Sequence, residues 1–138
     1  MNGNLERFKK AQEYSYKTAL KEVRNGRKVS HWMWYIFPQM RGLGQSSTAW
    51  TYGISDLQEA EEYLKDPVLG ARLTEISEAL MELEEKDADK IFGWPDVLKL
   101  RSCMTLFAAV SGKDSVFQRV LDAYYGGAAD ERTLELLQ

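Results

Sequence analysis

Several residue types that mark common protein classes are scarce in this 138-residue chain. One cysteine, Cys103, excludes an internal disulfide and fits a reducing cytoplasm. One histidine, His31, leaves no cluster of cysteine and histidine for a zinc or iron site. No apolar run approaches the roughly 20 residues of a membrane span, and "MNGNLERFKK" lacks the apolar core of a signal peptide. We therefore expect a cytoplasmic protein without a membrane partner.

Motifs for common cofactors are also missing. The chain contains neither the G-x-x-x-x-G-K-[ST] phosphate loop nor G-x-G-x-x-G, and no D-x-D-x-D-G calcium loop. The sequence predicts no cofactor and no metal. An isoelectric point near 5.3 argues against a nucleic-acid polymer as partner, and nothing in the sequence indicates a homo-oligomer.

Charge is unevenly distributed along the chain. Residues 1–50 contain nine Lys and Arg and three Asp and Glu, which gives a net charge of +6. Residues 51–138 contain nine Lys and Arg and 18 Asp and Glu, which gives a net charge of −9. A positive first part favours an anionic ligand there, while a surface with internal pairing of opposite charges explains the same pattern.

Apolar spacing predicts helices throughout a single domain covering residues 1–138. Steps of three and four residues between apolar side chains are typical of one buried helix face. The predicted helices cover residues 5–23, a stretch beginning at Ser55, residues 67–83, residues 95–110, residues 115–125 and a short stretch after Asp130. The fold class is therefore all-α, a single compact bundle of five or six helices with one irregular aromatic and Gly-rich segment at about residues 29–50.

That irregular segment contains the densest group of aromatic residues. It includes "HWMWYIFPQMRGLGQS", with two of the four tryptophans. An extended backbone would put Trp32 and Trp34 on one side, whereas a helical turn would put His31, Trp34 and Tyr35 together. One set is expected to pack on the core, and the other is either core as well or a wall on which a ring stacks.

"RGLGQSS", residues 41–47, is the candidate anion-binding turn. Gly42 and Gly44 permit close approach of a ligand to the backbone, and Arg41 and Ser46 could hold a phosphate or carboxylate. A flexible turn that needs glycine for its backbone is the alternative interpretation.

His31 is the candidate catalytic residue, since it is the one side chain that titrates near neutral pH. A hydrogen-bonded structural histidine is the plainer interpretation. A Cys–His dyad with Cys103 is disfavoured, because "RSCMTLF" places that thiol in the middle of an apolar helix. Lys99 and Ser102, on the predicted central helix, become ligand contacts if this helix packs against the irregular segment.

Four stretches of the sequence resemble the bacterial domain of unknown function 1810 family: "HWMWYIFPQMRGLGQSS", "AEEYLKDPVLGARL", "KLRSCMTLFAA" and "DAYYGGAADERTLELL". The resemblance extends from about Phe8 to the C-terminus. It implies a small, mostly helical single domain and no established activity. The positions that the family pattern marks are His31, Trp32, Trp34, Phe37, Pro38, Gln39, Gly42, Gly44, Ser46, Pro67, Gly70, Leu73, Lys99, Leu100, Met104, Thr105 and Phe107. The family commonly has serine at the position of Cys103, which further disfavours a thiol nucleophile.

Two functions remain open at this point. The first is a pocket for a small anionic molecule, a nucleotide or an ADP-ribose-like compound, with Trp32 and Trp34 stacking a ring, Gln39 giving amide contacts and Arg41 holding the anion. If catalysis occurs there, hydrolysis or group transfer with His31 as the acid–base residue is the expected class. The alternative is a non-catalytic protein–protein interaction module, in which the aromatic segment is a core plug or an interface patch.

Overall fold

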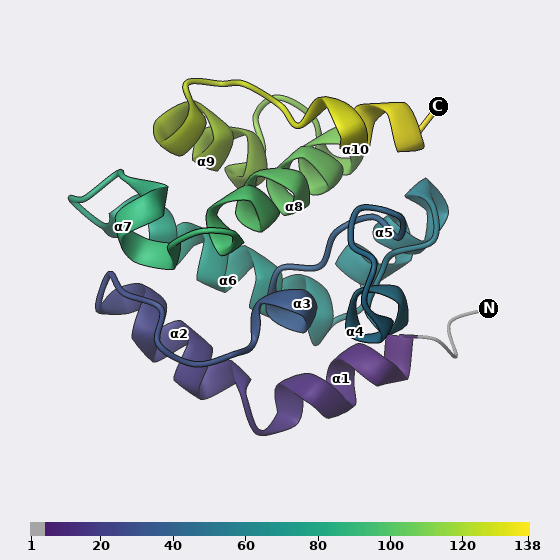
Figure 1. The fold of residues 1–138 in the computed structure, drawn as a ribbon, viewed down its shortest axis with the longest axis horizontal. Helices are drawn as coiled ribbons and strands as arrows, with labels where there is room; N and C mark the ends of the chain where they lie inside the picture. Colours follow the sequence, from purple (N-terminus) through teal and green to yellow (C-terminus); the bar gives the residue numbers. More distant parts are fainter. Residues whose placement is uncertain (1–4) are drawn as a thin grey trace.

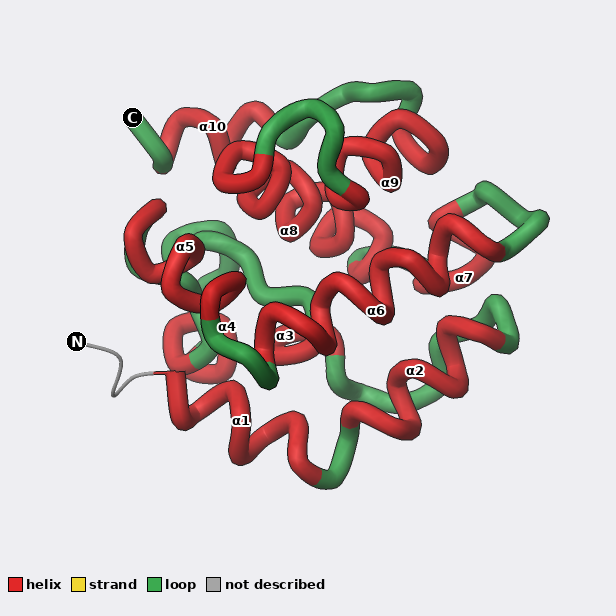
Figure 2. The backbone as a smooth tube through the Cα atoms, turned by 180° about the vertical axis from the view of Figure 1, so that it is seen from behind, coloured by secondary structure: helices red, strands yellow, loops and turns green. Residues whose placement is uncertain are grey.

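The computed structural model describes residues 5–138, and the regular structure of this part is helical (Figures 1 and 2). Residues 1–4, the start of the segment considered for a signal peptide, lie outside the described part. The helices are α1 (Glu6–Glu13), α2 (Tyr16–Arg24), α3 (Met33–Ile36), α4 (Ser47–Thr51), α5 (Leu57–Lys65), α6 (Leu69–Glu82), α7 (Ala88–Phe92), α8 (Asp96–Ser111), α9 (Val116–Tyr125) and α10 (Glu131–Leu136).

The all-α class is confirmed, but the expected number of five or six helices is too low, because residues 5–138 form ten. The predicted first helix is divided at Tyr14 and Ser15, and the 29–50 segment holds two short helices, α3 and α4. Helix α7 lies between the helices predicted at residues 67–83 and 95–110, where the sequence predicted no helix. These helices of four or five residues are too short to show a helical repeat in the sequence.

The division between α1 and α2 has a tertiary cause. Gln12, buried on the inner face of α1, donates from Nε2 to the Tyr35 carbonyl at 2.8 Å and to the Tyr63 hydroxyl at 2.9 Å. Ser15 Oγ lies 3.1 Å from the Tyr35 hydroxyl. The chain bends here so that both helices follow the same core (Figure 1).

Helix α8 forms the centre of the core and packs against α5, α7, α9 and α10. Its apolar side chains are fully buried over a wide arc, as Leu100, Cys103, Met104, Leu106 and Phe107 all show 0 % exposure. The helix predicted at residues 95–110 is observed with each boundary displaced by one residue. Burial also raises the pKa of the Cys103 thiol well above its ordinary value, which leaves this thiol protonated and inert.

The loop between α3 and α5 is closed by main-chain hydrogen bonds. An isolated parallel bridge joins Met40 to Ile54, where the Arg41 amide donates to the Ile54 carbonyl at 2.8 Å and the Ile54 amide donates to the Gln39 carbonyl at 2.9 Å. Residues 41–53 therefore leave and re-enter the core at one point, carrying α4 between them.

Candidate functional site

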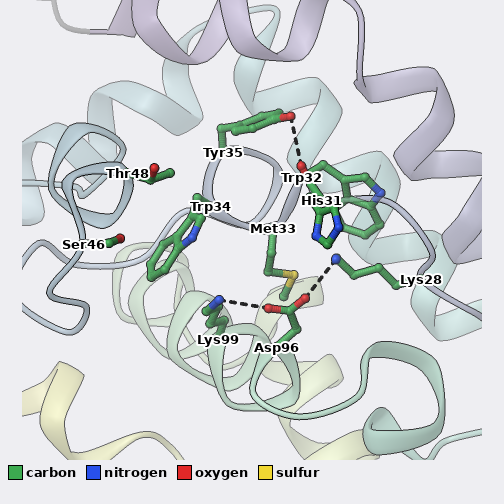
Figure 3. A pocket seen from close by; sticks show the side chains of 10 residues that line it. All are labelled: Lys28, His31, Trp32, Met33, Trp34, Tyr35, Ser46, Thr48, Asp96 and Lys99. Atoms are coloured by element: carbon green, nitrogen blue, oxygen red, sulfur yellow. Dashed lines mark hydrogen bonds and ion pairs between the residues drawn. The ribbon is translucent and has the colours of Figure 1, made fainter.

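A cleft with two lobes opens between α3, α4 and the first turns of α8. Both lobes are lined by Trp34 and Lys99, which stand where they meet. The lysine lobe, of about 320 Å³, is lined by Lys28, His31, Trp32, Met33, Trp34, Tyr35, Ser46, Thr48, Asp96 and Lys99 (Figure 3). The glutamine lobe, of about 250 Å³, is lined by Trp34, Gln39, Leu43, Gly44, Pro95, Leu98, Lys99, Ser102 and Asp130.

Two lysines share one carboxylate in the lysine lobe. Asp96, in the first turn of α8, accepts from Lys28 Nζ at 2.9 Å and from Lys99 Nζ at 3.0 Å. Burial by itself would raise the pKa of Asp96, but the hydrogen bonds from Lys28 and Lys99 outweigh it and hold the pKa below its ordinary value. The three ionised groups carry one net positive charge.

These charges are largely withdrawn from water, since the side chains of Lys28, Asp96 and Lys99 are 7 %, 17 % and 20 % exposed. Lys28 also donates to the Ser30 carbonyl at 2.6 Å, which leaves Lys99 as the less engaged cation. Charges interact more strongly where water is excluded, so an anion in this lobe would meet an attractive field.

Trp34 forms the wall between the lobes. Its indole is half-buried, and Lys99 Nζ lies 4.2 Å from the ring centroid, within the range of a cation–π interaction. Gly44 lies directly behind the ring, because a Cβ atom there would come within 2.7 Å of Trp34 Cη2 and 2.6 Å of Ala49 Cβ. The glycine is therefore required by packing against Trp34.

Hydroxyl groups face the lysines across the lobe. Figure 3 shows Ser46 and Thr48 on the side opposite Lys28 and His31, with Asp96 and Lys99 rising from α8. Ser46 Oγ accepts from the Ala49 amide at 3.1 Å as the N-cap of α4, which leaves its hydroxyl proton available to a ligand.

Glu22 of α2 fixes the backbone that carries His31. Its carboxylate accepts from the amides of Val29 and Ser30 at 2.8 and 2.9 Å, from Ser30 Oγ at 2.6 Å and from Trp32 Nε1 at 2.9 Å. Burial opposes ionisation, but these hydrogen bonds prevail and lower the pKa of Glu22 to about 2.

Glu22 is expected to contribute stability that acid removes. Its pKa falls from an ordinary 4.5 to about 2 on folding, so its contribution is complete above about pH 4.5 and disappears as the pH falls towards 2. Glu22→Gln should therefore lower the free energy of unfolding near neutral pH and differ little from the wild type near pH 2. Urea denaturation across this range checks the prediction, with Glu13→Gln, at an exposed position of α1, as the control. A wild-type advantage that stays constant down to pH 2 would contradict it.

The cleft brings together most of the residues predicted from the sequence. His31, Trp32 and Ser46 line the lysine lobe, Gln39, Gly44 and Ser102 line the glutamine lobe, and Trp34 and Lys99 line both. The contribution of Trp32 is small, because it is 1 % exposed and its indole N–H is engaged by Glu22.

Arg41 and Gly42 lie outside the residues that line either lobe. Arg41 donates from Nε to the Trp50 carbonyl at 3.0 Å, and its guanidinium stacks 4.3 Å from the Trp50 ring centroid. Gly42, with φ of +110°, faces the methyl groups of Leu136. The cations that line the cleft are thus Lys28 and Lys99, and Arg41 is not among them.

The residues that sequence reasoning did not include among the site candidates are Lys28, Glu22 and Asp96. Lys28 precedes the irregular segment at about residues 29–50. Lys28 and Asp96 are far apart in the chain, so no local pattern could pair them.

Residues 5–138 contain neither a clustered metal-ligand site nor a membrane-spanning helix. No group of three or more His, Cys, Asp or Glu side chains in residues 5–138 is placed to hold a metal ion. No helix in this part of the chain combines the length and apolarity needed to cross a membrane.

Fold and cleft together define a small all-helical domain with a cation-lined cleft beside a tryptophan. The model of the family described as "Protein of unknown function (DUF1810)" matches residues 2–137, and the chain belongs to that family, which confirms the resemblance seen in the sequence. The structure is similar to the crystal structure of the conserved hypothetical protein Rv1873 from Mycobacterium tuberculosis, with a TM-score of 0.94 and 47 % sequence identity over 97 % of this chain and 96 % of that one. Comparison with curated proteins gives no match.

Proposed function

We propose that this protein binds a small organic anion in the cleft, with a phosphate or carboxylate in the lysine lobe. The observation that carries the proposal is the arrangement of Lys28 and Lys99 around the single carboxylate of Asp96. Asp96 neutralises one of the two cations and holds both in place, so the second charge is available to a ligand. Hydroxyl donors at Ser46 and Thr48 suit the remaining oxygens of such a group.

A phosphorylated molecule with a ring, such as a nucleotide or an ADP-ribose-like compound, is the class we favour. Trp34 offers a half-buried indole next to the cations, and rings bind indoles by stacking. Each lobe is near the lower end of the roughly 300–1,000 Å³ typical of small-molecule pockets, so a ligand of this kind would use both.

Removing the Lys99 ammonium tests the proposal. Ribose 5-phosphate and inorganic phosphate are the probes, and isothermal titration calorimetry measures their affinities. A hydrogen bond to a charged group is worth about 1.5–3 kcal/mol, so Lys99→Met should weaken ribose 5-phosphate about tenfold or more. The variant should fold, because Asp96 keeps Lys28 as its partner.

The matched control is Lys17→Met, at an exposed position of α2. It removes the same charge from the protein far from the lining of the cleft. An equal loss of affinity in both variants would show that the loss comes from the change in net charge and not from a contact with Lys99. No loss of affinity in Lys99→Met would refute the proposed site.

Acid–base catalysis by His31 stays a prediction beside the proposed binding of an anion. The imidazole lines the lysine lobe. Among residues 5–138, no carboxylate or carbonyl accepts a hydrogen bond from it, so nothing there fixes its tautomer as in a general base.

A non-catalytic interaction module is the second candidate. The observation that favours it is the exposure of Trp94 and Trp50, at 77 % and 63 %, because exposed tryptophans are frequent anchors of protein interfaces. The same titrations separate the two candidates, since an interaction module predicts no response to either phosphate compound.

A further inference from the structure

Gln39 is a largely buried polar residue whose side chain has no hydrogen-bond partner among residues 5–138. It is 5 % exposed, and its backbone carbonyl is held by the Ile54 amide at 2.9 Å. So little exposure leaves the side-chain amide few contacts with water in place of a protein partner, and this residue therefore calls for an explanation.

Gln39 lines the glutamine lobe, and its amide is not sealed from solvent. In the described part of the chain, the one side-chain oxygen or nitrogen that is both sealed from solvent and unpartnered is Ser77 Oγ. The small exposed part of Gln39 therefore includes its amide, and the lobe that Gln39 lines is the space in which we place a partner for it.

Besides Lys99, two further polar residues of this lobe, Ser102 and Asp130, present acceptors. Ser102 Oγ donates its proton to the Leu98 carbonyl at 3.2 Å and keeps its lone pairs. Asp130 uses Oδ2 to accept from Thr133 as the N-cap of α10, and Oδ1 accepts from none of the residues 5–138. The lobe thus offers the paired donor and acceptor of one amide together with additional acceptors.

We infer that the glutamine lobe is a nucleobase subsite and that the ligand is a nucleoside monophosphate with an amino-bearing base. A glutamine amide pairs with the adjacent donor and acceptor on the edge of a base, as it does with adenine. The extra acceptors at Ser102 and Asp130 favour a base with an exocyclic amino group. This inference rests on the proposed function, which places the phosphate beside Lys99.

The geometry of the cleft suits a molecule of that length. Because Trp34 and Lys99 line both lobes, a phosphate at Lys99 and a base beside Gln39 occupy neighbouring spaces. The base would lie against the Trp34 indole, which lines the glutamine lobe as well, and the ribose would join the base to the phosphate. Leu98 gives the base an apolar contact in the second lobe.

The test compares AMP, UMP and ribose 5-phosphate by isothermal titration calorimetry in the wild type, Gln39→Met and Lys99→Met. In the wild type, AMP should bind about tenfold more tightly than ribose 5-phosphate, and UMP should bind more weakly than AMP. In Gln39→Met, the affinity for AMP should fall close to that for ribose 5-phosphate, and the affinity for ribose 5-phosphate should stay unchanged. Methionine is of similar length, and the substitution removes no hydrogen bond within the described protein.

Each alternative outcome has a defined meaning. Equal binding of AMP and ribose 5-phosphate by the wild type, both weakened by Lys99→Met, overturns the nucleobase subsite and leaves the proposed anion site standing. No binding of any of the three compounds overturns the proposed function. If the wild type binds UMP as tightly as AMP, the inferred preference for an amino group is overturned. This comparison needs no variant.

Ser102→Ala gives a second variant that tests the same lobe if Gln39→Met does not fold. It removes one acceptor, so it should reduce the preference for AMP over ribose 5-phosphate. If Gln39→Met does not fold, an unchanged preference in Ser102→Ala overturns the assignment of the base to this lobe, and if it folds, an unchanged preference in Gln39→Met does so.

Discussion

Replacing Asp96 by alanine is expected to lower the free energy of unfolding by about 3–5 kcal/mol, the cost typical of removing one partner from a buried ion pair. The reason is Lys28, whose side chain is only 7 % exposed and would lose its carboxylate while staying buried over the Trp32 ring. Lys99 would lose the same partner at 20 % exposure. Urea denaturation of wild type and variant measures the loss.

Two further variants show whether the uncompensated lysine is the cause. Lys28→Met in the Asp96→Ala background removes the stranded charge and should restore a large part of the stability. Asp114→Ala, at an exposed position between α8 and α9, should change the free energy of unfolding by no more than about 0.5 kcal/mol. A loss below about 1 kcal/mol in Asp96→Ala would show that Lys28 finds water or another acceptor.

Trp32→Ala should cost about 3–5 kcal/mol of stability, as for other fully buried aromatic residues. Trp32 is 1 % exposed, and its ring packs against Phe37 and Phe92 with centroids 6.1 and 6.4 Å away. Its loss would also take one of the hydrogen bonds that Glu22 accepts. Thermal and urea unfolding give the magnitude.

Trp34→Ala is the matched comparison for Trp32→Ala. Because Trp34 is half-buried in the cleft wall, its removal should lower the free energy of unfolding by less than the removal of Trp32. It should also weaken the binding of AMP, because stacking of a base is worth about 1–3 kcal/mol. The affinity for inorganic phosphate should stay nearly unchanged. If both tryptophan variants lose the same stability, the Trp34 ring is part of the core and not a ligand surface.

The contrast between these tryptophans shows what sequence patterns alone could not decide. The sequence left open whether the backbone around residues 32–36 is extended or helical, and the two choices place Trp32 and Trp34 differently. Helix α3 begins at Met33 and puts Trp32 inside and Trp34 at the cleft. Its short length hides its period, so only packing against α1 selects the helical turn.

Helix α8 was predictable for the opposite reason. Pro95 and Gly112 mark its ends locally, and its apolar arc is long enough to show its burial. Lys99 was a candidate from this helix, but the presence of Lys28 and the absence of Arg41 from the lining of the cleft were not predictable in this way. Arg41 contacts Trp50 of α4, a helix that the sequence did not reveal. Lys28 pairs with Asp96, which lies on a helix distant in the sequence.

The closed loop at Met40 and Ile54 separates two parts of the proposed site. The ends of this loop are joined by main-chain hydrogen bonds, which do not depend on the side chains between them. Ser46 and Thr48 lie within the loop, whereas Lys28, Asp96 and Gln39 lie outside residues 41–53. We therefore expect substitutions of Ser46 or Thr48 to change the affinity of the proposed cleft for an anion while the closure of the loop and the two lysines stay in place.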